Sequence, residues 1–153
     1  MKIAVFSDSH GDVQAMVRAV RGYGPDLVLH LGDHAADAEE LAAECGVAIR
    51  RVRGNCDLAS RAPDSDLFEL AGVRILMCHG HRHRVKLTLD ALLNAAHFSR
   101  ADVVLYGHTH IADLQHEGQM LVLNPGSIGT GSNPSWAKLE LEDGTARAEI
   151  VRI

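Results

Sequence analysis

Five short, largely apolar runs, each followed by a polar loop that contains glycine, constrain the fold of this chain more than any other feature of its sequence. Each run is four to six residues long, a length that suits a strand better than a helix. They occupy residues 3–6, 27–31, 47–52, 73–77 and 103–106. A run that is apolar throughout, such as residues 3–6, is typical of a strand buried on both faces of a sheet. The polar loops then lie at the carboxyl ends of strands, where open α/β sheets bind ligands.

Apolar residues at helical spacing occur in three further segments, residues 13–20, 36–44 and 87–98. Asp12 is placed as the N-cap of the first helix, which we expect to end at Gly22 and the Gly24-Pro25 pair. The repeated order of strand, polar loop and helix predicts an α/β protein with right-handed parallel crossovers. Residues 67–77 add a predicted hairpin, and the chain after residue 110 reads as further strands. No repeat or linker divides the sequence, so we expect one domain over residues 1–153.

Composition narrows the class of protein. A chain of 153 residues is long enough to bury a core without disulfides, and 46% hydrophobic with 23% charged residues is ordinary for a globular protein. The formal charge of −5 argues against nucleic acid as a partner, since phosphate neutralisation calls for clustered Lys and Arg. Three cysteines without a CxxC pair favour a reducing compartment, which we expect to be the cytoplasm. No stretch is apolar enough to span a membrane, and the small domain is compatible with a homodimer.

The polar loops carry side chains that can bind metal. They are Asp8, His10, Asp33, Asn55, His79, His81, His108 and His110. Any single Asp or Asn here is also compatible with a helix N-cap or a turn, and a single His with a hydrogen bond to a backbone carbonyl. Five independent loops that all end in metal-competent side chains make a metal site the better interpretation.

The donor set also limits the number and type of metal ions. One tetrahedral zinc needs about four ligands, and these loops offer more than that without a thiolate motif. Two ions that share a carboxylate would use all of the donors. Mixed carboxylate, amide and imidazole donors favour transition metals over calcium or magnesium. We therefore expect two divalent ions, manganese first, with iron, zinc, cobalt or nickel as alternatives.

The ordered series of loop motifs resembles the five-block signature of the calcineurin-like metallophosphoesterases. The motifs are Asp8-Ser9-His10, Gly32-Asp33, Gly54-Asn55-Cys56-Asp57, Cys78-His79-Gly80-His81 and Gly107-His108-Thr109-His110. The short chain and the Asn124-Pro125-Gly126-Ser127 loop are similar to the small bacterial and archaeal phosphodiesterases of that family. The resemblance implies a four-layer sandwich, in which two mixed β-sheets are flanked by helices and the metal site lies at the carboxyl ends of the strands.

Carried over position by position, the resemblance implies the ligands of each metal ion. Asp8, His10, Asp33 and His110 would hold one ion. Asp33, Asn55, His79 and His108 would hold the other, so that Asp33 bridges the pair. The implied reaction is hydrolysis of a small phosphate ester, most of all a phosphodiester, by attack of a hydroxide that bridges the two ions.

The resemblance also implies catalytic roles for Asn55, Asp57 and His81. The amide oxygen of Asn55 can coordinate metal while its NH2 group donates to a phosphate oxygen. The family often has a histidine, paired with the next acidic residue, where this chain has Cys56 before Asp57. A thiol replaces imidazolium poorly as a general acid. We therefore expect water or another histidine to supply the proton, and His81 is the nearest in sequence.

Two other functions remain open at this stage. A nuclease is one alternative, although the net charge argues against it. The other is a non-catalytic protein-binding scaffold similar to the retromer subunit that shares this fold. Intact metal-competent residues in all five loops weigh against a scaffold, since binding alone does not need them.

Overall fold

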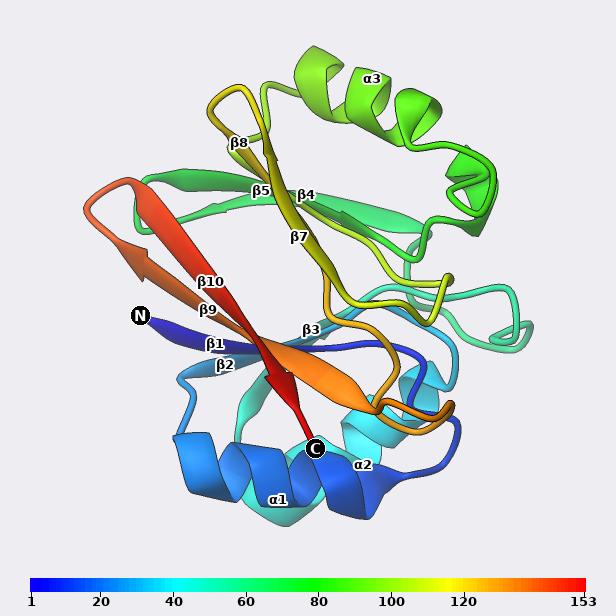
Figure 1. The fold of residues 1–153 in the computed structure, drawn as a ribbon. Helices are drawn as coiled ribbons and strands as arrows, with labels where there is room; N and C mark the ends of the chain where they lie inside the picture. The colour runs from blue at the N-terminus through cyan, green and yellow to red at the C-terminus, as the bar shows by residue number, and fades with distance from the viewer.

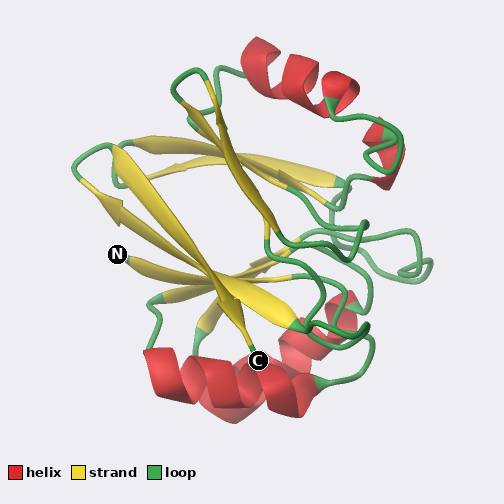
Figure 2. Cartoon of the chain, viewed as in Figure 1, coloured by secondary structure: helices red, strands yellow, loops and turns green.

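The computed structural model describes residues 1–153 as two five-stranded β-sheets that pack face to face (Figures 1 and 2). The first sheet has the order β10-β9-β1-β2-β3. Its strands are β1 (Lys2–Phe6), β2 (Leu27–His30), β3 (Ala48–Arg51), β9 (Ser135–Glu142) and β10 (Thr145–Arg152). β1, β2 and β3 run parallel, while β9 is antiparallel to β1 and to β10, so the sheet is mixed.

The second sheet has the order β4-β5-β6-β8-β7 and is also mixed. Its strands are β4 (Ser65–Leu70), β5 (Val73–Cys78), β6 (Val103–Leu105), β7 (Asp113–Glu117) and β8 (Met120–Asn124). β5, β6 and β8 run parallel, and β4 and β7 close the two edges in antiparallel orientation. The predicted hairpin over residues 67–77 is confirmed as the β4–β5 pair.

Helices cover the outer face of each sheet, so the four-layer sandwich is confirmed (Figure 1). α1 (Val13–Tyr23) and α2 (Ala35–Cys45) pack on the first sheet, and α3 (Asp90–Phe98) packs on the second. Asp12 caps α1 by accepting a hydrogen bond from the Ala15 N–H, as expected. The helix continues through Gly22 and ends at Gly24, which adopts the left-handed conformation that glycine favours. No helix has both the length and the apolar character needed to cross a bilayer.

The main core lies between the sheets and explains the wholly apolar strands. Alternate residues of one strand, such as Ile3 and Val5 of β1, point into this inner core, while Ala4 and Phe6 point toward α1 and α2. In the second sheet, Ile75 and Met77 face the inner core and Leu76 faces α3. Each central strand therefore buries both of its faces, and burial of apolar surface on both sides stabilises it.

Strand direction places the polar loops. The carboxyl ends of β1, β2 and β3 lie at one edge of the first sheet, and those of β5 and β6 lie at the facing edge of the second sheet. The two edges are joined directly, since the backbone N–H of His108, after β6, donates to Asp8 after β1, and His79 Nδ1, after β5, lies 2.8 Å from the Leu31 carbonyl after β2. The candidate site therefore lies at the junction of the two sheets.

Candidate metal centre

Four of the predicted ligands converge on one point, and we call them the carboxylate-rich group: Asp8, His10, Asp33 and His110. One donor atom from each lies within 4.8 Å of the donor atoms of the others. Both carboxylates are almost fully buried, with Asp8 at 0% and Asp33 at 3% relative exposure. Buried charges need close partners, since desolvation of an unpaired carboxylate is costly.

One oxygen of each buried carboxylate accepts hydrogen bonds from the protein, and the other faces the remaining donors of the carboxylate-rich group. Asp8 Oδ2 accepts hydrogen bonds from Ser7 Oγ at 2.6 Å and from the His108 N–H at 3.1 Å. Asp33 Oδ1 accepts one from the Cys56 N–H at 2.9 Å. Asp8 Oδ1 and His10 Nε2 are buried and have no hydrogen-bond partner. Unpaired buried polar atoms are rare in proteins, so these two call for a bound cation.

A chain of hydroxyl groups fixes the tautomer of His110. Ser127 Oγ donates to the Asp8 carbonyl at 2.8 Å, so it accepts from Thr130 Oγ1, which lies 2.8 Å away. Since the Thr130 proton is then engaged, Thr130 Oγ1 accepts from His110 Nδ1 at 3.2 Å. His110 Nε2 is thereby left with a lone pair that faces Asp8 Oδ1 at 3.0 Å. Two acceptors at this distance repel each other unless a cation lies between them.

A second set of donors, the imidazole pair His79 and His108, lies beside the first. His79 Nδ1 lies 2.8 Å from the Leu31 carbonyl and donates to it, so Nε2 carries a lone pair. That Nε2 lies 3.2 Å from His108 Nδ1 and 3.5 Å from Asp33 Oδ2. Asp33 Oδ2 also lies 4.0 Å from His10 Nε2, so this one oxygen faces both sets of donors.

The pKa values of the side chains at the centre also indicate that it favours positive charge. Burial lowers the pKa of His79, yet Asp33 and Asp8 more than offset it, and the pKa is raised. Burial likewise opposes ionisation of Asp33, but the neighbouring His79 ring and the Cys56 N–H hold its pKa well below its usual range. Burial, and then the neighbouring His79, lower the pKa of His108 to about 4. The two buried carboxylates thus favour positive charge beside them.

The loop backbones are shaped to aim these side chains. Five ligand-bearing positions have positive φ, between 46° and 69°: Asp8, His10, Asp33, His108 and His110. Asp and His tolerate this region better than most residues, yet such conformations still cost free energy and cluster at functional sites. Gly107 allows the last loop to approach, because a Cβ there would collide with Ser7 Oγ. Gly54 serves the same purpose against Asp33.

Three residues of the loop after β3 differ in their surroundings. The Asn55 side chain is exposed, and its Nδ2 lies 3.6 Å from Cys56 Sγ, so no hydrogen bond joins its amide to the other predicted ligands. Cys56 is an exposed residue, but partial desolvation of its sulfur, and then the neighbouring Asp33, raise the pKa of its thiol. Asp57 accepts three backbone N–H bonds of 2.8 to 2.9 Å, from Asp33, Ala35 and Gly54, and so ties this loop to the start of α2.

His81 lies beside the imidazole pair, with its ring centroid 5.5 Å from that of His79 and 6.1 Å from that of His108. Its Nδ1 is buried without a hydrogen-bond partner. Burial, and then the neighbouring His79, lower the pKa of His81, so its ring is neutral near pH 7. A neutral imidazole at the rim can receive or relay a proton.

A buried chain that the sequence did not reveal supports the loop after β1. His30 Nδ1 accepts from the Gly32 N–H, so His30 Nε2 donates to Ser9 Oγ at 2.9 Å, and Ser9 Oγ donates to Asp37 at 2.7 Å. Burial lowers the pKa of His30 to about 4, which keeps the ring neutral. No motif marks His30 or Asp37, because each acts through a neighbour and not on a ligand.

The structure thus brings together six of the seven predicted metal ligands, all except Asn55. The donor chemistry fits divalent transition metal, since carboxylate oxygens and imidazole nitrogens with free lone pairs face one another. Thr130 and Ser127, which orient His110, are further functional residues. The loop over residues 124–127 stood out in the sequence, but Thr130 did not.

Comparison with known proteins agrees with this site. Residues 1–144 match the calcineurin-like phosphoesterase superfamily domain. The chain is 34% identical over 151 residues to the probable metallophosphoesterase YsnB of Bacillus subtilis, an alignment that covers 95% of this chain and 88% of that protein. It is 28% identical over 163 aligned residues to the phosphodiesterase YfcE of Escherichia coli, which covers 88% of this chain and 84% of YfcE.

The fold also occurs in a protein of another kind. The crystal structure of Vps29 from Entamoeba histolytica in complex with zinc superimposes with a TM-score of 0.81 at 20% identity, covering 99% of both chains. At this identity the likeness shows a shared fold and no more. Function in this chain therefore has to be argued from the side chains at the junction of the sheets.

Proposed function

Because the chain belongs to the calcineurin-like phosphoesterase superfamily, we propose that it is a phosphodiesterase that works with two divalent metal ions. One observation carries the proposal: four donor atoms from three separate loops lie within 4.8 Å of one another, and two of them are buried without partners. A scaffold that only binds proteins has no need to bury unpaired lone pairs at this cost.

The residues divide between the two ions as follows. The carboxylate-rich group would hold the first ion, and Asp33, Asn55, His79 and His108 would hold the second. The position of Asp33 Oδ2, which faces both His10 and His79, supports a shared ligand. Asn55 would join the second set by turning its amide, since its one hydrogen bond is to sulfur and therefore weak. Manganese is our first choice, with iron, zinc, cobalt or nickel as alternatives.

When bound, such ions lower the pKa of a coordinated water and neutralise charge on the phosphate oxygens. The protein's own side chains position the substrate. We expect the Asn55 NH2 group to donate to a phosphate oxygen and His81 to contact the ester at the rim. The approach of a phosphate anion would raise the pKa of His81, so that its ring can deliver a proton to the departing oxygen.

Asp57 would act through the loops that it holds. Its carboxylate fixes the Gly54 and Asp33 backbones, so it sets the position of Asn55 and of the shared carboxylate. Cys56 stands beside both with a raised pKa, which makes its thiol a poor proton donor at neutral pH.

Turnover of bis(p-nitrophenyl) phosphate and p-nitrophenyl phosphate, with manganese added, tests the proposal. We expect the diester to be the better substrate. Asp33→Ala should reduce turnover on the order of a thousandfold, since it removes a ligand of both ions, and His79→Ala by a smaller factor. His116→Ala, an exposed histidine of β7, is the matched control and should have no effect.

Bound metal should be measured in the same samples. Absence of both metal and turnover in the parent protein would contradict the enzyme proposal and favour a scaffold. Unchanged turnover in Asp33→Ala and His79→Ala would show that the reaction takes place elsewhere.

A further inference from the structure

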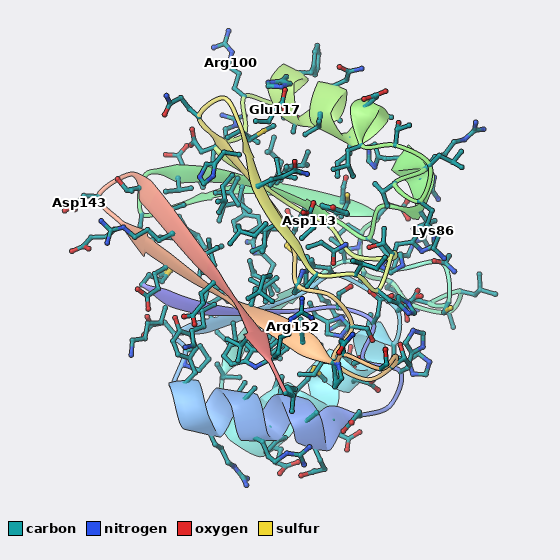
Figure 3. The ribbon with its side chains drawn as sticks, viewed as in Figure 1. Lys86, Arg100, Asp113, Glu117, Asp143 and Arg152 are labelled. Carbon is teal, nitrogen blue, oxygen red and sulfur yellow. The ribbon has the colours of Figure 1, made fainter.

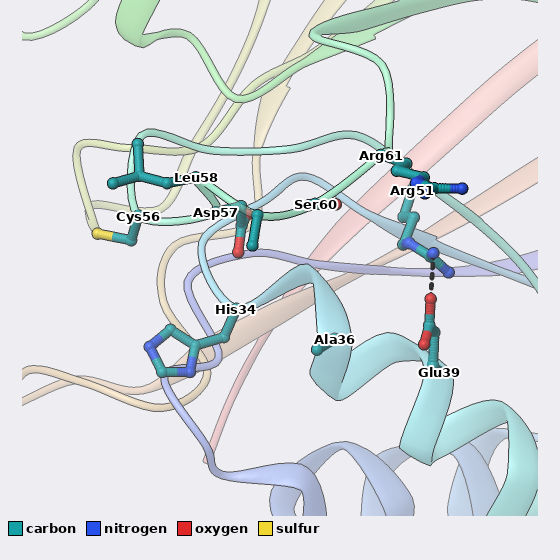
Figure 4. A pocket seen from close by; sticks show the side chains of 10 residues that line it. His34, Ala36, Glu39, Arg51, Cys56, Asp57, Leu58, Ser60 and Arg61 are labelled. Atoms are coloured by element: carbon teal, nitrogen blue, oxygen red, sulfur yellow. Dashed lines mark hydrogen bonds and ion pairs between the residues drawn. The ribbon is translucent and has the colours of Figure 1, made fainter.

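A cleft of about 580 Å³ opens beside the metal centre, and no role in the reaction has so far been assigned to it. Its walls are the loop after β3 and the first turns of α2 (Figure 4). His34 and Cys56 lie at one end of it, and Arg51 and Arg61 at the other (Figure 4). The His34 ring lies 4.9 Å from that of His10, between ring centroids, so the near end of the cleft adjoins the carboxylate-rich group.

The far end of the cleft carries an uncompensated positive charge. Arg51 is paired with Glu39, as Figure 4 shows, so these two charges largely cancel. The Asp57 carboxylate is occupied by three backbone N–H groups. Arg61 is exposed and makes neither an ion pair nor a hydrogen bond through its side chain, so its guanidinium is free to bind an anion. Ser60 Oγ accepts from the Ala62 N–H, which leaves the Ser60 hydroxyl proton available as a donor.

One wall of the cleft is apolar. Leu58 lines it and is 91% exposed, which makes it one of the most exposed large hydrophobic side chains in the molecule. Ala59 and Ala36 add further apolar surface. A binding site with an apolar wall and a cation at its far end suits a ring-bearing group that ends in an anion.

A smaller cleft also borders the carboxylate-rich group, since His110 lines it. It has a volume of about 270 Å³ and is lined by His110, Thr130 and Arg152, among others. Arg152 stands near the end of β10 (Figure 3). The His10 ring is close to a residue of each cleft, with its centroid 4.9 Å from that of His34 and 5.4 Å from that of His110. A diester has two arms, and the larger cleft alone falls within the volume range usual for small-molecule sites.

We propose that the larger cleft binds one arm of the phosphodiester, and that the preferred arm is a nucleoside that carries a second phosphate. This rests on the proposed phosphodiesterase activity and names its substrate class. The nucleoside ring lies against Leu58, and its terminal phosphate pairs with Arg61, with Ser60 as an additional donor. Arginine suits this position because its planar fork binds two phosphate oxygens at once.

Two chromogenic diesters that differ by one phosphate test this directly. They are the p-nitrophenyl ester of thymidine 5′-phosphate and the same ester with a further phosphate on the 3′ oxygen. In both, water adds to phosphorus, the bond to the aryl oxygen breaks, and p-nitrophenolate and the thymidine phosphate are released. We expect the 3′-phosphate to lower KM about three- to fivefold, the worth of one charge-assisted pair at an exposed site.

Arg61→Gln should abolish this preference, so that the ratio of the two KM values falls to about one. Arg18→Gln makes the same charge change on the exposed side of α1, outside the cleft, and should keep the KM ratio of the parent protein. Arg152→Gln tests the smaller cleft and should also keep it.

The outcomes separate the two proposals. If neither ester is hydrolysed, the phosphodiesterase proposal itself fails. If both are hydrolysed with equal KM, or if Arg152→Gln and not Arg61→Gln removes the preference, the diesterase stands but the larger cleft is not the site of the phosphate-bearing arm.

Discussion

The two halves of the metal centre are prepared to different degrees. In the carboxylate-rich group, Asp8 and Asp33 each have one oxygen fixed by hydrogen bonds to the protein, and His110 is held by Thr130. The imidazole pair has one such support, the bond from His79 to the Leu31 carbonyl. Asn55, which is also a predicted ligand of the second ion, is turned toward Cys56. Preorganised donors bind metal more tightly, because less ordering is left for the moment of binding.

The difference indicates that the fold prepares one half of the centre, whereas in our proposal the other half is completed when the Asn55 side chain turns. Backbone geometry does not separate the two halves. All four residues of the carboxylate-rich group have positive φ, and so does His108, so the difference lies in the side-chain hydrogen bonds and in Asn55. We therefore expect two metal sites of unequal affinity, with the carboxylate-rich group the tighter one.

The largest expected effect comes from removing one ligand on each side. His110→Ala should weaken the tighter manganese site by at least about a hundredfold, since even residues that only orient a ligand cost 10- to 100-fold. His108→Ala should weaken the second site and leave the tighter one in place. Calorimetric titration of the metal-free protein with manganese measures both affinities. Equal loss of the tighter site in the two variants would break the distinction between the halves.

Removing the support of His110 while keeping the ligand should have a smaller effect. Thr130→Val has nearly the same shape but lacks the oxygen that accepts from His110 Nδ1, so we expect the tighter site to bind manganese about tenfold or more weakly. Thr130→Ser keeps the oxygen and should restore most of the affinity. Wild-type affinity in Thr130→Val would show that the hydroxyl chain does not orient His110.

The smallest effect concerns pH and the buried chain behind the loop after β1. The pKa of His30 is about 4 in the folded protein and about 6.5 when unfolded, so the unfolded state binds the proton first as pH falls. The stability that His30 contributes is fully present above pH 6.5 and is lost below it. We expect about 1 kcal/mol of this loss between pH 6.5 and 5.5.

Urea unfolding of the metal-free protein at the two pH values measures this loss. His30→Gln, which does not titrate, removes the contribution of His30, so the difference between wild type and variant isolates it. An identical pH dependence in both proteins would show that His30 is not held neutral by burial.

Much of the site could be predicted from the sequence because its chemistry is local. Each donor follows an apolar strand within a few residues, and strand direction alone sends Asp8 and Asp33 to the same edge of the first sheet. The start of α1 after its N-cap, Asp12, could also be predicted, since an N-cap bonds to the first turn of its own helix. The third helix was expected from residue 87 but begins at Asp90, because a 3₁₀ turn and a loop occupy the residues before it.

What could not be predicted depends on contacts between distant residues. Nothing near Thr130 in the sequence shows that its hydroxyl group meets His110, and nothing near His30 shows that it supports Ser9. The orientation of Asn55 depends on the loop that Asp57 holds, and that loop is anchored to the start of α2, 22 positions earlier. The cleft that ends at Arg61 likewise forms between two segments that are separate in sequence.

The sequence by itself determined the α/β class, the family and the chemistry of the donors, because periodicity and motif spacing act over a few residues. The tertiary structure alone decided which donors meet and which of their lone pairs stay free. The His108 N–H reaches Asp8 across 100 positions of the chain, and it does so because two separate sheets pack with their carboxyl edges together. Local sequence patterns determine which donor side chains each loop carries, whereas the packing of the sheets determines where those donor atoms lie.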